Sequence, residues 1–213
     1  MRMRGGLIAV VIACLLLGWW LAHPPATLPR PEAPATPGCP LPPRVPRGDP
    51  PLQTDAPRGL ALPAIGAATL SPLAGFSVEA RVLGREDYRL GREAEFSPTD
   101  LALGWDRMAD DTVLAQLTIS QGGRWYRYRW QDQPPIPADE IARSSANMHI
   151  VPANDAVAAA LGRVEAGQRL RIDGWLVRID ADDGRWHWRS SLSRDDSGDG
   201  ACELVYACAL TTL

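Results

Sequence analysis

The fold class of this 213-residue chain rests on ten residues, Leu170-Arg171-Ile172-Asp173-Gly174-Trp175-Leu176-Val177-Arg178-Ile179. In Leu170-Arg171-Ile172 the apolar residues are even-numbered, whereas Trp175, Val177 and Ile179 are odd-numbered. Because successive side chains point to opposite faces of a strand, this change of phase predicts an extra residue, a β-bulge, near Gly174. A glycine at such a point is typical of a bulge or of a sharp corner in a β-barrel.

The elements around this stretch follow the order of a small barrel. We expect strands over residues 76–83, 148–151, 185–192 and 203–209, a hairpin over residues 118–130 that turns at Gln121-Gly122-Gly123, and helices that begin near Ser97, Asp110, Asp139 and Asn154, the last one ending at Gly167. This is the order of elements in an oligonucleotide/oligosaccharide-binding (OB) barrel, whose helix lies between strands three and four. The predicted fold class is α+β, mainly β: an N-terminal transmembrane helix, a proline-rich linker and an OB-like small β-barrel domain with short helices.

The first 22 residues carry the pattern of a membrane anchor. Arg2 and Arg4 precede Gly5–Ala22, an uncharged apolar run that spans about 27 Å at about 1.5 Å per residue, enough to cross the hydrocarbon core. Two tryptophans close its far end, and the next positive charge is Arg30. The positive-inside rule then predicts a single-pass protein of the inner (cytoplasmic) membrane, with a cytoplasmic N-terminus and a periplasmic or otherwise extracytoplasmic C-terminal domain.

Two other interpretations of this segment stay open. Val11-Ile12-Ala13-Cys14 loosely fits the acylation site of a lipoprotein, although the sequence remains apolar after it. A cleaved signal peptide needs small residues before the cut, whereas Trp20 stands two residues before Ala22 and prolines follow soon after. All three interpretations predict export.

The next segment is rich in proline. Residues 23–58 hold 13 of the 20 prolines, and such a composition lacks the apolar content to fold and favours polyproline II. We therefore expect three regions: an anchor over residues 1–22, a disordered stalk over residues 23–58 and a single folded β-rich domain over residues 59–213.

The charged residues narrow the range of functions. All 22 basic residues are arginines, so Schiff-base chemistry and a P-loop lysine are excluded. Residues 59–213 hold 16 of the 22 basic and 22 of the 25 acidic residues, a net charge of −6. An acidic domain gains no long-range attraction to a polyanion, which disfavours nucleic acid as a partner.

Three segments carry a resemblance to a known group of sequences. They are Ser144-Ser145-Ala146-Asn147-Met148-His149, Ser190-Ser191-Leu192-Ser193-Arg194-Asp195-Asp196 and Gly200-Ala201-Cys202-Glu203-Leu204-Val205. In these segments the chain resembles a family of uncharacterised bacterial proteins that are membrane-anchored or exported. The resemblance covers about residues 76–206. It implies an envelope location and a single domain, and it supplies no catalytic residue.

The candidate ligand-binding segment is a run of arginines and aromatic residues over residues 124–130. On a strand, one face carries Tyr126, Tyr128 and Trp130, and the other carries Arg127 and Arg129. Aromatic rings stack with bases and with sugars, and strands two and three of an OB barrel carry such contacts. The alternative is that the aromatic residues belong to the core, while the arginines form a solvated face.

Metal and catalytic groups have only weak candidates. Asp195 and Asp199 imitate the first half of a calcium-binding loop, but Tyr206 stands where that loop needs a glutamate. His149 and His187 are the only histidines after the stalk, and no zinc-ligand spacing or nucleophile elbow accompanies them. We therefore expect no catalytic residue, no metal and no cofactor.

Three cysteines lie outside the predicted anchor. Cys202 and Cys208 are six residues apart on one strand, about 20 Å if extended, which is too far for a disulfide between them. This leaves a bridge from Cys39 or one to another chain.

Together these observations predict a non-enzymatic binding or scaffolding module that a stalk holds off the membrane. Besides the membrane itself, the predicted partner is an envelope protein or a glycan. One alternative is a metal-dependent or hydrolytic enzyme that uses His149 and His187. Another is an OB-type binder of glycan or single-stranded nucleic acid that uses the strand Trp125–Trp130.

Overall fold

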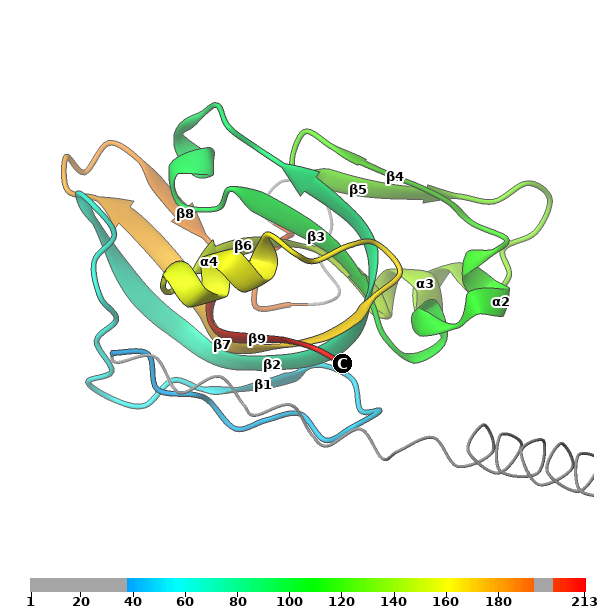
Figure 1. The fold of residues 1–213 in the computed structure, drawn as a ribbon, viewed down its shortest axis with the longest axis horizontal. Coiled ribbons are helices and arrows are strands. Elements are labelled where there is room, and N and C mark those ends of the chain that lie inside the picture. The colour runs from blue at the N-terminus through cyan, green and yellow to red at the C-terminus, as the bar shows by residue number, and fades with distance from the viewer. Residues whose placement is uncertain (1–37, 194–200) are drawn as a thin grey trace, which may run out of the picture. The chain divides into compact units, whose positions relative to one another are not determined.

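The computed structural model describes residues 38–193 and 201–213, which belong to one compact unit and are mainly β. The elements in chain order are β1 (Leu52–Asp55), β2 (Ala68–Asp87), a 3-10 helix (Arg92–Glu95), β3 (Thr99–Gly104), a second 3-10 helix (Asp106–Ala109), α2 (Asp111–Leu114), β4 (Thr118–Gly122), β5 (Trp125–Arg129), α3 (Ala138–Arg143), β6 (Ser145–Pro152), α4 (Asp155–Leu161), β7 (Arg169–Ala181), β8 (His187–Arg189) and β9 (Glu203–Thr212). Figure 1 shows the long strands curving around a common interior.

Five of the strands form a closed barrel in the order β2-β3-β6-β9-β7. The barrel closes because β7, at the end of this order, also pairs with β2. Neighbouring strands are antiparallel except β6 and β9, which run parallel. The short strands β1 and β8 add to β2 and β7, respectively. Helix α4 connects the third barrel strand, β6, to the fourth, β7. The helix predicted between the third and the fourth barrel strand is therefore present.

Alternate side chains of the barrel strands fill its interior. The inward residues of β2 are Phe76, Val78, Ala80 and Val82, as their alternation predicts. Helix α4 adds Val157 and Leu161 to the same cluster and so covers one opening of the barrel. The predicted strand over residues 76–83 is thus confirmed, although β2 extends well beyond it at both ends.

Both faces of β7 are buried, and this corrects the interpretation of its phase change. Ile172 and Leu176 belong to the barrel core, whereas Trp175 and Ile179 belong to a second cluster outside the barrel wall. The sequence therefore looks apolar in two phases because each phase packs against a different cluster. No residue needs to be inserted into β7 to explain the pattern.

The predicted irregularity near Gly174 does exist, but its extra residue lies on the partner strand. Asp173 pairs with Ala209 and Gly174 pairs with Ala207, so β9 bulges at Cys208. A Cβ atom on Gly174 would overlap a backbone carbonyl oxygen of β9, which explains why the residue with no side chain stands here.

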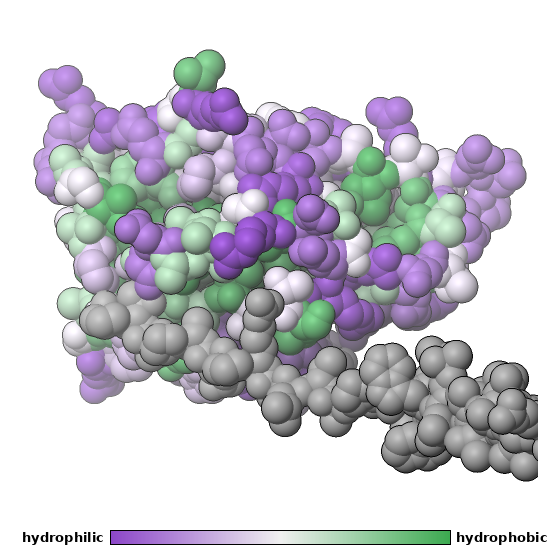
Figure 2. Space-filling model, in the orientation of Figure 1, coloured by the Kyte–Doolittle hydropathy of each residue, from purple (hydrophilic) through white to green (hydrophobic). Residues whose placement is uncertain are grey.

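The hairpin of β4 and β5 forms a separate two-stranded sheet between barrel strands β3 and β6 in the chain (Figure 1). Gly122 pairs with Trp125, so the turn residues are Gly123 and Arg124, and of the predicted turn Gln121-Gly122-Gly123 only Gly123 lies in it. With α2 and α3 the hairpin encloses a third cluster built on Met108, Val113, Ile136 and Ile141. On the face drawn in Figure 2, hydrophobic residues gather at this end of a mostly hydrophilic surface.

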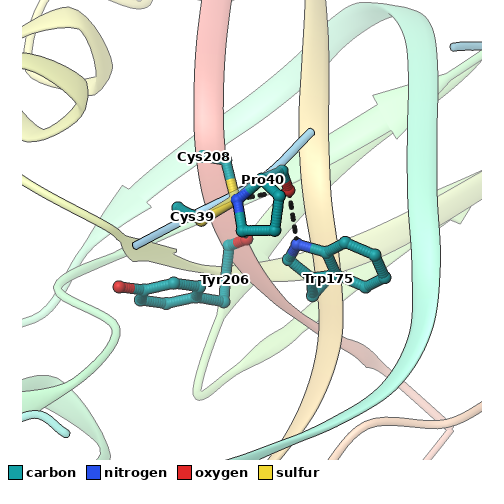
Figure 3. The surroundings of a disulfide bond; sticks show 5 residues. All are labelled: Cys39, Pro40, Trp175, Tyr206 and Cys208. Carbon is teal, nitrogen blue, oxygen red and sulfur yellow. Dashed lines mark hydrogen bonds between the residues drawn. A yellow bond between two sulfur atoms is a disulfide. The ribbon is translucent and has the colours of Figure 1, made fainter. Parts of the chain in front are cut away.

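The predicted stalk over residues 23–58 is corrected for its described part, residues 38–58. This segment packs against the barrel: Cys39 is fully buried, Val45 is buried, and β1 pairs with β2. A disulfide joins Cys39 to Cys208, and Trp175 Nε1 donates a 2.8 Å hydrogen bond to the Pro40 carbonyl oxygen (Figure 3). Proline content alone was misleading because the apolar residues between the prolines cover the second cluster.

Of the predicted helix starts, the one at Ser97 is wrong and the one at Asn154 is confirmed. Thr99 begins β3 instead, because this strand pairs on both sides, with β2 and with β6, and directs Leu101 into the barrel core. Asn154 Oδ1 accepts a 2.8 Å hydrogen bond from the Val157 backbone N–H, as an N-cap should. Helix α4 ends at Leu161, six residues before Gly167.

The membrane part of the prediction is also corrected. Within residues 38–193 and 201–213, no helix has the length and apolar character needed to cross a membrane, and the longest, α4, has seven residues against the roughly 20 required. The predicted segment Gly5–Ala22 lies outside the described residues. The transmembrane helix in the predicted fold class and the single-pass inner-membrane location are therefore not supported, and the fold class is corrected to mainly β.

Candidate ligand-binding face

A buried carboxylate lies at the centre of a polar cluster on the outer side of β3 and β6. The Asp100 side chain is fully buried, and its Oδ1 accepts a 2.7 Å hydrogen bond from Arg124 Nη1. His149 Nδ1 lies 2.9 Å from the same oxygen, and Asn147 Nδ2 donates to Oδ2 at 3.2 Å. Neighbouring Leu101 faces the barrel core, so strand alternation turns Asp100 outward. We call these four polar residues the Asp100 cluster.

Arg124 reaches this cluster from the tip of the β4–β5 hairpin. Gly123 and Arg124 have φ angles of 61° and 68°, the left-handed pair of values that a two-residue type I′ turn requires. For a non-glycine residue this conformation costs on the order of 1 kcal/mol, so Arg124 is held there by its contacts. Its backbone N–H donates to Tyr88 Oη at 2.8 Å, and Nη1 also donates to the Ser97 carbonyl oxygen at 2.9 Å.

Hydrogen bonds connect the hairpin tip to β6, and the thiol of Cys202 lies near them. Gln121 Nε2 donates to Asn147 Oδ1 at 2.8 Å, and Asn147 Nδ2 donates to the Arg124 carbonyl oxygen at 3.0 Å. The Sγ atom of Cys202, which precedes β9, lies 3.9 Å from that same carbonyl oxygen. The cluster therefore draws on the hairpin, two barrel strands and the start of a third.

A row of aromatic rings borders the Asp100 cluster. Trp188 lies 4.7 Å from the His149 ring and 6.3 Å from Trp186, which stacks on Phe96 at 5.3 Å between ring centroids. The Arg124 guanidinium lies between Tyr88 and Trp188, 3.9 Å and 5.5 Å from their ring centroids. The rings come from two connections of the barrel, between β2 and β3 and between β7 and β9. We call Phe96, Trp186, Trp188 and Tyr88 the aromatic row.

The two predicted histidines lie in different surroundings. His149 Nδ1 is buried 2.9 Å from Asp100 Oδ1 but makes no hydrogen bond among the described residues, so the carboxylate does not orient the imidazole as it would for a general base. Its side chain is only 5% exposed, whereas His187 is exposed on β8 opposite Asp180. Among the residues that the structure describes, no group of three or more His, Cys, Asp and Glu residues could hold a metal ion. The calcium-loop candidates Asp195 and Asp199 lie outside those residues.

The predicted ligand strand, β5, lies beside the cluster and outside it. Arg127 and Arg129 are exposed opposite Ser120 and Thr118 of β4. On the other face, Tyr126, Tyr128 and Trp130 are half-buried, and the last two pack on the third hydrophobic cluster.

The sequence indicated only part of the Asp100 cluster and its border. It pointed to His149 as a candidate but not to Asp100, Arg124, Asn147, Tyr88 and Trp188. The available signal was the Gly-Gly-Arg turn, which places an arginine at a hairpin tip.

The pH dependence of stability tests how deeply the Tyr126 side chain of β5 is buried. Burial holds the pKa of its phenol well above the usual value, and the hydrogen bond with the Ser145 hydroxyl offsets only part of that shift. Ionisation therefore favours the unfolded chain: the stabilisation is complete below the unfolded-state pKa of about 10 and is lost as pH rises through the folded-state value.

We expect the urea midpoint of unfolding, followed by circular dichroism, to fall between about pH 9 and pH 11, and to fall less steeply in Tyr126→Phe. The difference between the two chains isolates Tyr126, because burial also raises the pKa of Tyr88, Tyr128 and Tyr206. Parallel pH profiles of the wild-type chain and the variant would show that the Tyr126 phenol is not held neutral.

Comparison with models of known protein families, with curated proteins and with solved structures gives no match. The resemblance noted from the sequence therefore stays a prediction.

Proposed function

We propose that this chain is a non-catalytic binding domain that recognises a partner protein through the outer face of β3 and β6. The observation that supports this most directly is the position of Arg124, which lies on that face between Tyr88 and Trp188 and remains 19% exposed. The proposal keeps the binding role predicted from the sequence and moves its centre from the exposed side of β5 to the hairpin tip.

The energetics of the Asp100 cluster support a role other than stability. Burying an ion pair costs desolvation energy that the attraction between the charges repays only in part, so apolar residues would stabilise this face as well or better. Arg124 also bears the cost of a left-handed backbone. Strained backbone and buried charge commonly gather where a protein binds its ligand.

The composition of the face favours a protein as the ligand. Arginine, tryptophan and tyrosine are the residues most enriched among binding hot spots, because each combines a large contact area with hydrogen-bonding groups. Trp186, Trp188 and Tyr88 are each half-buried, so part of each ring is accessible.

Capture of partners from a lysate of the source cells tests this proposal. Trp188→Ala should reduce the amount of the captured partner at least about tenfold, as for a hot-spot residue, and Arg92→Ala should reduce it with no change in Tm. Arg92 is a surface residue whose guanidinium lies 5.8 Å from the Trp186 ring centroid. It therefore separates loss of binding from loss of folding.

The matched control is the double variant Arg127→Ala/Arg129→Ala, which removes two exposed arginines from the outer side of β5. We expect it to capture the partner as well as the wild-type chain does. Full capture by Trp188→Ala and Arg92→Ala, together with loss of capture by the control, would place the binding surface on β5 and refute the proposal.

A further inference from the structure

A second site lies at the base of the β4–β5 hairpin, away from its tip. A pocket of about 510 Å³ opens there, within the range of volumes that small-molecule sites occupy. Its lining comes from the segment before β4 and the segment after β5: Ala115, Gln116, Leu117, Thr118, Trp130, Gln131, Asp132 and Gln133. Trp130 and Arg124 lie at opposite ends of β5, about 20 Å apart at about 3.4 Å per residue, so this pocket is separate from the Asp100 cluster.

The lining of this pocket is rich in neutral side chains that form hydrogen bonds. Three glutamine amides and one threonine hydroxyl each can both donate and accept hydrogen bonds, and Asp132 adds a carboxylate acceptor. Trp130 is the one aromatic residue in the lining, and the lining includes no arginine or histidine. The pocket therefore offers many neutral hydrogen-bonding groups beside one large ring, and no positive charge.

We infer that this pocket binds a neutral saccharide unit. A sugar presents adjacent hydroxyl groups that pair with amides and carboxylates, and its C–H faces lie favourably on the electron-rich face of an indole ring. Because Asp132 is the only charged residue in the lining, an anionic ligand would meet repulsion and no compensating cation.

Trp130 is held in a way that suits a stacking platform. It is half-buried, packs against the third hydrophobic cluster and lies 6.1 Å from the Tyr128 ring at an interplanar angle of 23°. These contacts fix the orientation of the indole, so a ligand would lose little of its binding energy in ordering it. Gln131 and Gln133 are exposed beside it and lie in the segment that leads to α3.

The experiment measures binding of the folded chain to a defined set of probes by ligand-observed NMR and isothermal titration. The probes are oligosaccharides of glucose and of N-acetylglucosamine, an oligomer of galacturonic acid as the anionic saccharide, and adenosine as a neutral stacking ligand that is not a sugar chain. We expect at least one neutral oligosaccharide to bind at millimolar concentration, and stronger binding of that probe than of galacturonate or adenosine.

Gln131→Ala/Gln133→Ala should weaken this binding about tenfold, which corresponds to the loss of roughly two net hydrogen bonds, and should leave Tm unchanged because both side chains are exposed. Trp130→Ala should abolish binding, and its Tm shows whether folding is also affected. The control Arg127→Ala/Arg129→Ala, on the outer side of the same hairpin, should bind as the wild-type chain does.

The inference is overturned if no neutral oligosaccharide of the set binds, if adenosine or galacturonate binds more strongly, or if the glutamine double variant binds as tightly as the wild-type chain. Trp188→Ala, which tests the partner-binding face, should leave saccharide binding intact. The two proposals can therefore fail independently of each other.

Discussion

Reduction of the Cys39–Cys208 disulfide is expected to lower the free energy of unfolding by about 5 kcal/mol. The bond closes a loop with a sequence separation of 169 residues, and the entropy that such a cross-link removes from the unfolded chain grows with the size of the loop. Both cysteines are buried, and the bond fastens the segment after Cys39 over Trp175 and the second hydrophobic cluster. Its loss should therefore also loosen that segment.

Chemical and thermal denaturation of wild type, Cys39→Ser and Cys202→Ser, each with and without reductant, measure this effect. We expect Cys39→Ser and reduced wild type to lose the same stability, seen as a fall in Tm of about 10–20 °C. Cys202 is the matched control, because the structure gives it a thiol and no disulfide. Its variant should stay within about 0.5 kcal/mol of wild type. Equal stability of Cys39→Ser and wild type under oxidising conditions would mean that the disulfide does not hold the fold.

Arg124→Ala is expected to destabilise the chain by about 3–5 kcal/mol, the usual cost of removing one partner of a buried ion pair. The Asp100 carboxylate is fully buried, and among the described residues the hydrogen bond from Asn147 and the nearby His149 ring would remain beside it. Loss of the arginine also removes the hydrogen bond to the Ser97 carbonyl oxygen and the contact with the Tyr88 ring.

A double-mutant cycle with Asp100→Asn separates the charge from the packing. If the ion pair causes the effect, Arg124→Ala should cost at least about 2 kcal/mol less in the Asp100→Asn background than in wild type. Arg127→Ala, an exposed arginine three residues further on, should change stability by less than about 0.5 kcal/mol. An equal cost of Arg124→Ala in both backgrounds would show that the carboxylate does not depend on the guanidinium.

The sequence predicted those parts of the fold in which apolar residues line one face of an element at its regular spacing. The alternation of Phe76, Val78, Ala80 and Val82 identified β2, and the Asn154 cap identified α4, because in each case a local pattern and the tertiary packing agree. Prediction was wrong where packing overrides the local pattern. Ser97 precedes a proline as a helix cap would, yet pairing on both sides makes the following residues a strand.

The candidate site was predicted less well than the fold. Asp100, Arg124 and His149 are far apart in the chain, and only the register of β3 with β6 and the turn at the hairpin tip bring them together. No spacing along the sequence predicts that these three residues come together. The partner of Cys39 was left open for the same reason, since the path of the proline-rich segment over the barrel depends on contacts with β7 and β9.

Site-specific photo-crosslinking tests the central claim, that the face around Arg124 binds a partner protein. Leu90, which is 90% exposed two residues after Tyr88, is replaced by benzoylphenylalanine in one chain and Arg127 in another, and each is irradiated in a lysate of the source cells. We predict a discrete covalent adduct from position 90 and none from position 127, with the same adduct weakened when Arg92→Ala is added. An adduct from position 127 alone, or none from position 90, would contradict the claim.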